Sequence, residues 1–205
     1  MTSDQRVTAA LIIIGNEILS GRTQDANLSF LAGRLGEIGI QVVEARVIPD
    51  VEQTIIDTVQ TLSAQVDYVF TSGGIGPTHD DITADSIAEA FGVGIDVDPR
   101  AKEILEAHFP PGQLTPARLR MARIPDGADL IHNSVSKAPG FRIGNVHVMA
   151  GVPSIMQAML DAIAPTLKTG RKMLSRTVDA NLPESRIAER LRDIQNEFPE
   201  TLIGS

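Results

Sequence analysis

The chain has 205 residues, of which 42% are hydrophobic and 21% charged, and its formal net charge at pH 7 is −8. This composition is typical of a globular protein, and the acidic balance disfavours general nucleic-acid binding, which normally needs a basic surface. The absence of cysteine excludes disulfides, thiolate metal sites and cysteine nucleophiles, and no apolar run approaches the roughly 20 residues that span a bilayer, so we expect a cytoplasmic protein without a membrane partner.

The first half of the chain alternates predicted strands with predicted helices. Residues 7–14 form a nearly continuous apolar run, which is typical of a strand buried on both faces of a parallel sheet. The next elements, in chain order, are a helix at 28–35, a strand at 40–48, a helix at 55–62, a strand at 66–71 and a helix at 84–91. This alternation predicts βαβ crossovers and a mainly parallel sheet with helices on both sides, an α/β fold.

The second half is less regular. It predicts a helix at 99–109, a short helix opening at Thr115-Pro116, a hairpin of 141–143 with 146–149, and a helix at 153–164. Apolar content drops near 168–171, which predicts a main domain at 1–168 and a partial small α+β domain or appendage at 169–205. In that appendage we expect a strand at 173–178, a helix around 187–194 and another strand at 201–205.

A glycine-rich turn follows the strand at 66–71. Glycines at 73, 74 and 76 allow positive φ and close approach of backbone N–H groups to a ligand. The helix behind them offers unpaired N–H groups and the positive end of its dipole, which suits an anion. The alternative is a tight connection in which Asp81 or Thr83 only caps the helix. A cap accounts for one acidic residue but not for three glycines and a second carboxylate, so we predict a binding site.

Ligands of open parallel sheets bind at the carboxyl ends of strands, and polar or glycine residues follow three of the predicted strands. From them we expect a phosphate- or nucleotide-binding set at Gly15, Asn16, Ser72, Gly73, Gly74, Gly76, Pro77, Thr78, Thr83 and Gly151. Lys137 could contact phosphate or be solvated, and the role of His79 stays open. We interpret Arg118, Arg120 and Arg123 as a solvated helix face.

Carboxylates lie beside this expected anion site. Placing Asp80 and Asp81 near a phosphate costs energy unless a cation lies between them, and such ligands suit Mg²⁺ or Mn²⁺, although a carboxylate could instead orient or deprotonate water. The alternative is a cap plus one solvated acid. Glu17 could complete a metal or water site, which makes Asp81, Asp80 and Glu17 the catalytic candidates and Asp80 and Asp81 the metal ligands. Asp25 or Asn27 is a natural N-cap, and for Asn27 we favour the cap.

Four strings occur in the order and context of one family: Ile14–Gly21, Ser72–Thr83, Ala138–Phe141 and Ala150–Pro153. Residues 7–165 thereby resemble the molybdopterin-binding (MoaB/Mog-like) domain, in the form found at the N-terminus of competence/damage-inducible CinA proteins. The tail from 172 resembles the start of the small domain that follows it. The resemblance implies a three-layer α/β/α fold, a homo-oligomer, and a small-molecule nucleotide or pterin phosphate as ligand.

The same resemblance leaves three functions open. CinA-type members resemble hydrolases that cleave ADP-ribose at the pyrophosphate with a divalent metal (Mg²⁺, Mn²⁺ or Co²⁺), and related domains hydrolyse FAD. The cofactor branch binds molybdopterin or adenylylates it with ATP and Mg²⁺; there an aspartate matching Asp81 is essential, and a basic residue tends to stand in place of Asp80. The third possibility is a non-enzymatic oligomer that senses a nucleotide. The Asp80–Asp81 pair favours the hydrolase, although Ile155 stands where many CinA-type sequences have Glu.

Overall fold

The computed structural model describes residues 6–172, 174, 176–201 and 203–204. Two compact units divide the chain, Met1–Met173 and Leu174–Ser205, and each is described by itself. The first unit extends past the last helix of the main domain, because Gly170 N donates to Gly39 O over 3.2 Å.

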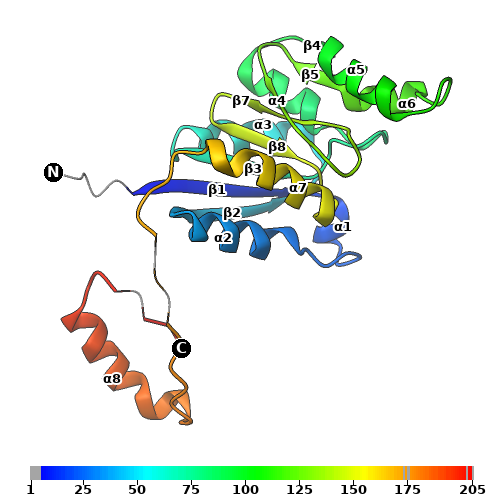
Figure 1. Ribbon diagram of the computed structural model, residues 1–205. Helices are drawn as coiled ribbons and strands as arrows, with labels where there is room; N and C mark the ends of the chain where they lie inside the picture. Colours follow the sequence, from blue (N-terminus) through cyan, green and yellow to red (C-terminus); the bar gives the residue numbers. More distant parts are fainter. Residues whose placement is uncertain (1–5, 173, 175, 202, 205) are drawn as a thin grey trace. The chain divides into compact units, whose positions relative to one another are not determined.

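A six-stranded sheet forms the centre of the first unit, with the order β2-β1-β3-β8-β7-β6 (Figure 1). Its strands are β1 Val7–Ile14, β2 Ile40–Ile48, β3 Tyr68–Ser72, β6 Asp129–Ile131, β7 Gly140–Ile143 and β8 Val146–Met149. The strands β2, β1, β3 and β8 pair in parallel, whereas β8, β7 and β6 pair antiparallel. The prediction of a mainly parallel sheet with an antiparallel hairpin is confirmed.

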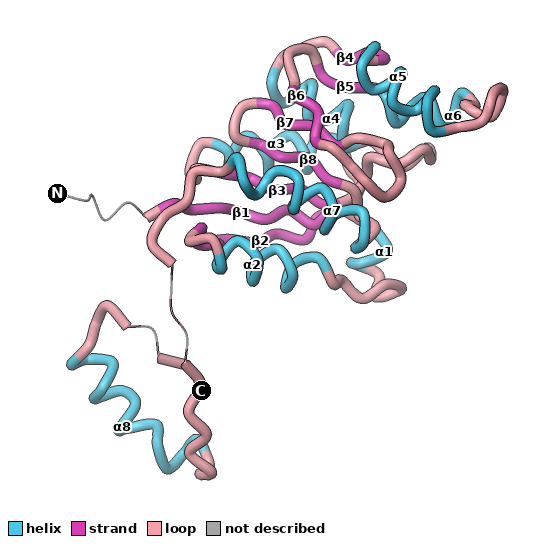
Figure 2. Tube along the Cα trace, viewed as in Figure 1, coloured by secondary structure: helices cyan, strands magenta, loops and turns pink. Residues whose placement is uncertain are grey.

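Helices cover both faces of this sheet (Figure 2). The helices of the first unit are α1 Asn16–Leu19, α2 Asn27–Glu37, α3 Glu52–Ser63, α4 Thr83–Phe91, α5 Pro99–His108, α6 Pro116–Leu119, η1 Arg120–Ala122, α7 Pro153–Ile163 and η2 Ala164–Thr166. α2 and α7 pack on one face, and α3 and α4 pack on the other. The expected three-layer α/β/α arrangement is therefore present. None of the helices within the described residues is long and apolar enough to cross a membrane.

Strand β1 lies between the two hydrophobic cores. Ala9 and Leu11 belong to the core under α2 and α7, while Ala10, Ile12 and Ile14 belong to the core under α3 and α4. Successive side chains of a strand point to opposite faces, so a strand covered on both faces needs apolar residues at every position. This is why the sequence shows a continuous apolar run here instead of an alternation.

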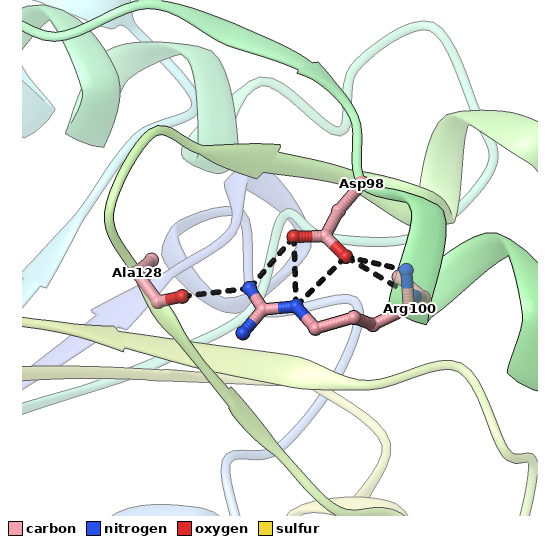
Figure 3. A network of polar contacts seen from close by, with 4 residues as sticks. Asp98, Arg100 and Ala128 are labelled. Atoms are coloured by element: carbon pink, nitrogen blue, oxygen red, sulfur yellow. Dashed lines mark hydrogen bonds and ion pairs between the residues drawn. The ribbon is translucent and has the colours of Figure 1, made fainter.

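A separate segment links α4 to β6 and carries a second sheet. Its two strands, β4 Ile95–Val97 and β5 Arg123–Pro125, pair antiparallel. Asp98 caps α5 by accepting from the backbone N–H of Arg100, and its carboxylate also pairs with the Arg100 guanidinium at 2.7 Å. The same guanidinium donates to the carbonyl of Ala128 over 3.0 Å (Figure 3). Arg100 holds the pKa of Asp98 below its ordinary value, so this carboxylate is ionised at neutral pH and ties α5 to the connection before β6.

His147 is a buried histidine in the centre of the sheet. Its side chain on β8 is 2% exposed and stacks on Phe70, with ring centroids 4.9 Å apart. Burial, and to a smaller degree the charge of Arg142, lowers the pKa of His147 to about 4. The imidazole is therefore neutral in the folded protein at pH values where an unfolded histidine is already protonated.

We expect this histidine to make the fold sensitive to mild acid. Between pH 6.5 and about 4 the unfolded state binds the extra proton, so the free energy of unfolding should fall as pH drops through that window, by about 3 kcal/mol in total. Replacing His147 by phenylalanine should remove this contribution. Urea unfolding of both proteins at pH 7.5 and pH 4.5 measures it, and an equal loss of stability in wild type and variant would contradict the prediction.

The second unit contains α8, Glu184–Glu197, which confirms the predicted helix around 187–194. The strands expected at 173–178 and 201–205 are wrong at the described residues, since 174, 176–178, 201, 203 and 204 are not in strands. Residues 173, 175, 202 and 205 lie outside the described part. A strand needs a neighbour to pair its backbone groups, and the described residues of this unit form no strand that offers one.

Candidate functional site

The strand order identifies the point at which a ligand is expected. From β1 the chain moves outward to β2 and then crosses back to β3 on the other side of β1. In open α/β sheets, ligands bind outside the carboxyl ends of the strands at such a reversal. Gly15 follows the carboxyl end of β1 and Gly73 follows that of β3, so both predicted turns lie at this switch point.

Three glycines bring the ends of three parallel strands into close contact. Gly15, Gly73 and Gly151 follow β1, β3 and β8, and we call them the glycine cluster. Gly73 has φ of 117°, and a Cβ there would overlap with the carbonyl oxygen of Ile14. A Cβ at Gly151 would lie 3.3 Å from Gly73 Cα. Backbone therefore approaches backbone where side chains would otherwise stand; Gly15 and Gly73 are buried by this packing, and Gly151 is exposed.

The start of α4 lies directly against the glycine-rich turn. Gly74 has φ of 69°, a Cβ there would overlap with Thr83 Oγ1, and Thr83 N donates to Gly74 O over 3.0 Å. Thr83 is fully buried, and its hydroxyl has no hydrogen-bond partner among the described residues. No side chain caps α4. An uncapped helix N-terminus beside an unpaired hydroxyl favours an anionic ligand group.

Asp81 organises the turn before α4 instead of capping the helix. Its Oδ2 accepts from Thr78 N at 2.8 Å and from Thr78 Oγ1 at 2.5 Å. The Asp80 side chain is 62% exposed, and its Oδ1 lies 3.9 Å from Nδ1 of the exposed His79. The pKa of Asp80 is below its ordinary value, first because of the neighbouring Thr78 hydroxyl and to a smaller degree because of the charge on Arg22. Two carboxylates thus flank one threonine at the edge of the site.

Gly76 and Pro77 complete this turn. A Cβ at Gly76 would lie 2.6 Å from Asp81 Oδ2, so the backbone wraps closely around that carboxylate. Pro77 is exposed. Lys137 has φ of 65° and lies in the loop before β7, where Asn133 Nδ2 donates to Ser136 Oγ and to Ala138 O over 2.7 and 2.9 Å.

The residues after β1 are arranged by local bonds. Gly15 N donates to Ile48 O over 3.1 Å, and Asn16 N donates to Asp50 Oδ2 over 2.8 Å, so both amides are engaged within the protein. The Glu17 carboxylate folds back over Gly15, with Oε1 2.5 Å from the position of a Cβ there. Among the described residues, no three histidine, aspartate or glutamate side chains gather around one point where they could hold a metal ion.

Asn27 has a role that sequence reasoning missed. The expected cap is wrong, because Asp25 caps α2 by accepting from Asn27 N at 3.2 Å and from Leu28 N at 3.0 Å. The Asn27 side chain is 5% exposed, and its Nδ2 donates to Ser72 Oγ over 2.8 Å and to Gly151 O over 2.7 Å. The Asp-x-Asn spacing at 25–27 was the signal available in the sequence. A helix start needs only one side-chain cap, and because Asp25 supplies it, the Asn27 side chain can bond elsewhere.

Two of the three arginines interpreted as a solvated face contact the turn before α4 or α4 itself. Arg123 makes a two-bond ion pair with Asp85 of α4, at 2.7 and 2.9 Å. Arg120 donates to the backbone carbonyl of Asp81 over 3.4 Å. Both arginines line a cavity of about 20 Å³ with Gly76 and Asp81, which has room for a water rather than for a nucleotide. The solvated interpretation is wrong for Arg123, whose half-buried guanidinium pairs with Asp85, whereas Arg120 is exposed, as that interpretation expects.

Known proteins resemble this chain over most of its length. Residues 10–169 match the protein family described as "Probable molybdopterin binding domain". A protein of Archaeoglobus fulgidus is 33% identical over 195 residues, which are 95% of this chain and 83% of that protein. A CinA-like protein of Citrifermentans bemidjiense is 39% identical over 168 residues, 79% of this chain and 41% of that protein. A probable FAD synthase of Caenorhabditis elegans is 31% identical over 227 residues, 98% of this chain and 44% of that protein. The chain therefore spans less than half the length of the last two relatives.

Solved structures of related proteins share the α/β/α fold described above. The crystal structure of CinA from Thermoplasma acidophilum superposes with a TM-score of 0.74 at 35% identity, covering 80% of this chain and 99% of that one. The tungsten cofactor synthesizing protein MoaB from Pyrococcus furiosus superposes with a TM-score of 0.52 at 20% identity, covering 78% of this chain and 92% of that one, which shows a common fold.

Proposed function

Because the chain belongs to the family of molybdopterin-binding domains, in its CinA-like form, we propose that the glycine cluster binds phosphate groups and that the protein hydrolyses the pyrophosphate bond of ADP-ribose or a similar dinucleotide. The observation that carries the proposal is the close approach of Gly73 to Ile14 and Gly151 at the switch point of the sheet. Gly15 N and Gly73 N are bonded within the protein, so the groups that would hold phosphate are the exposed Gly151–Val152 backbone and the uncapped starts of α4 and α7. Helix N-termini at strand ends are the usual means by which such sheets hold phosphate.

Two helices that begin at this edge favour a ligand with two phosphates. α4 follows β3 and α7 follows β8, these strands are neighbours, and neither helix has a side-chain cap. Each N-terminus carries a partial positive charge of about half an elementary charge. A diphosphate places two anionic groups a few ångströms apart and so matches two adjacent helix starts better than a monophosphate does.

The carboxylates supply the chemistry at the edge of this site. In hydrolysis a water oxygen bonds to one phosphorus, the bridging P–O bond breaks, and ADP-ribose yields AMP and ribose 5-phosphate. The described residues form no three-ligand metal site, but Mg²⁺ is commonly held by one or two carboxylates together with substrate phosphates. Asp80 and Asp81 are the residues that would hold such a cation, which would neutralise phosphate charge.

Molybdopterin is the second candidate ligand. The family description names it, and the same glycine cluster would bind the phosphate of the pterin. Asp80 is exposed at the edge of the site, and if the ligand is molybdopterin we expect this side chain to take no part in binding the phosphate. The two proposals therefore differ in what they ask of Asp80.

The test is hydrolysis of ADP-ribose, with FAD as a second substrate, by the purified chain with and without Mg²⁺, Mn²⁺ or Co²⁺. We expect metal-dependent release of AMP, and chromatography of the reaction mixture measures it. No turnover by folded protein with any of the three metals, together with binding of molybdopterin, would replace the hydrolase proposal with the second candidate.

A further inference from the structure

We propose that Asn27 is a positioning residue, which holds the ends of β3 and β8 at the separation that the phosphate site requires. This inference rests on the proposed function for the ligand and concerns a residue that contributes no charge to the site. Asn27 comes from the start of α2, far in the sequence from both of its partners, Ser72 and Gly151.

Asn27 completes a continuous set of bonds between the two strand ends. Gly73 N donates to Met149 O at 3.1 Å, Ser72 Oγ donates to Ala150 O at 3.3 Å, and Asn27 Nδ2 donates to Gly151 O at 2.7 Å. Three consecutive carbonyls, the last of β8 and the two that follow it, thus accept bonds from β3, its adjoining turn or α2. Asn27 also donates to Ser72 Oγ, so it supports the second of these bonds as well as making the third.

These bonds fix the direction of the neighbouring amides. In a trans peptide the C=O and the following N–H point in opposite directions. The carbonyl of Gly151 points to the buried Asn27, so the N–H of Val152 points away from it, and both Gly151 and Val152 are exposed. Those amides precede the uncapped start of α7. Without the Asn27 bond the Gly151–Val152 peptide is free to rotate, and the amide direction is lost.

Packing alone does not explain why an asparagine occupies position 27. Its Oδ1 is buried and has no hydrogen-bond partner among the described residues, and an unpaired buried acceptor is destabilising. An apolar residue of similar size would avoid that penalty. Positions that break such a local rule are expected at functional sites.

The chain offers a matched control at Asn145. Its Nδ2 also donates twice, to Ser63 O and to Val66 O, both over 3.0 Å. Asn145 precedes β8 and therefore lies at the opposite end of that strand from Gly151. Asn27→Ala and Asn145→Ala each remove two hydrogen bonds from one asparagine, but only the first removes them from the proposed site.

The experiment measures binding of ADP-ribose and of inorganic phosphate to the full chain by calorimetry, without added metal, well below the unfolding midpoint. We expect Asn27→Ala to raise the Kd for ADP-ribose at least tenfold, and Asn145→Ala to leave it within twofold of wild type although both lower the urea midpoint. Asn27→Leu, which keeps the size but cannot donate and adds no charge, should raise the Kd in the same way and replaces Asn27→Ala if that variant folds poorly.

Two results would overturn the positioning role. One is wild-type affinity in both Asn27 variants, and the other is an equal loss of affinity in Asn145→Ala, which would indicate a general effect of stability. Absence of ADP-ribose and phosphate binding by the wild type would instead overturn the proposed function, and this inference with it.

Discussion

Replacing Gly73 by alanine is expected to destabilise the fold by more than about 3 kcal/mol, because two separate penalties coincide at this residue. The first is conformational: φ of 117° is a backbone conformation that residues with a Cβ rarely adopt. The second is steric, since the new Cβ would overlap with the carbonyl oxygen of Ile14. That carbonyl belongs to β1, which is buried on both faces and cannot move without disturbing two cores.

Substitutions at two other glycines distinguish the conformational penalty from the steric one. Gly21 also has positive φ, 72°, but a Cβ there would meet nothing within 4 Å, so Gly21→Ala should cost only about 1–2 kcal/mol. Gly33 lies within α2 with open space around it, and Gly33→Ala should stabilise the protein by about 0.5–1 kcal/mol. Urea unfolding of the three variants ranks them. A Gly73→Ala variant as stable as Gly21→Ala would show that the contact with Ile14 is not restrictive.

Much of the fold followed from local pattern. The apolar run at 7–14 predicted a doubly buried strand because parallel sheets covered on both faces leave no polar side. The hairpin was predicted from Gly144-Asn145, and Gly144 does take positive φ, 56°. The turn at 72–83 was placed correctly at a strand end, because any strand-to-helix connection of a parallel sheet has its turn at that edge.

The features that sequence could not predict depend on partners distant in the chain. The strands β4, β5 and β6 have three residues each, too few for an alternating pattern to be read. The solvated interpretation of Arg123 fails because nothing local in the sequence indicates that Asp85, 38 positions away, lies opposite it. Asn27 bonds residues 45 and 124 positions away, and its amide is equally compatible with a cap until those partners are seen.

Replacing Asp81 by asparagine is expected to lower kcat for pyrophosphate hydrolysis by about 100-fold or more, the usual effect of removing a group that acts directly on the reaction. An asparagine carbonyl can still accept from Thr78 N, as Asp81 Oδ2 does at 2.8 Å. The turn should therefore persist, with a change in the free energy of unfolding of about 1 kcal/mol or less. Asp57→Asn, on the exposed face of α3, is the control for loss of one negative charge.

The measurement is initial-rate kinetics for AMP release with Mg²⁺ across a range of ADP-ribose concentrations. A fall in kcat with little change in KM would show that Asp81 acts in the reaction itself, whereas a rise in KM alone would show that it only helps to bind the substrate.

A second variant, Asp80→Ala, decides between the two candidate functions. It should abolish metal-dependent hydrolysis if the protein is a pyrophosphatase, yet leave pterin binding intact if the site serves molybdopterin, because Asp80 is exposed beside the site and not within the glycine cluster. Full hydrolysis by both aspartate variants would remove the carboxylates from the mechanism and leave the backbone of the glycine cluster as its only support.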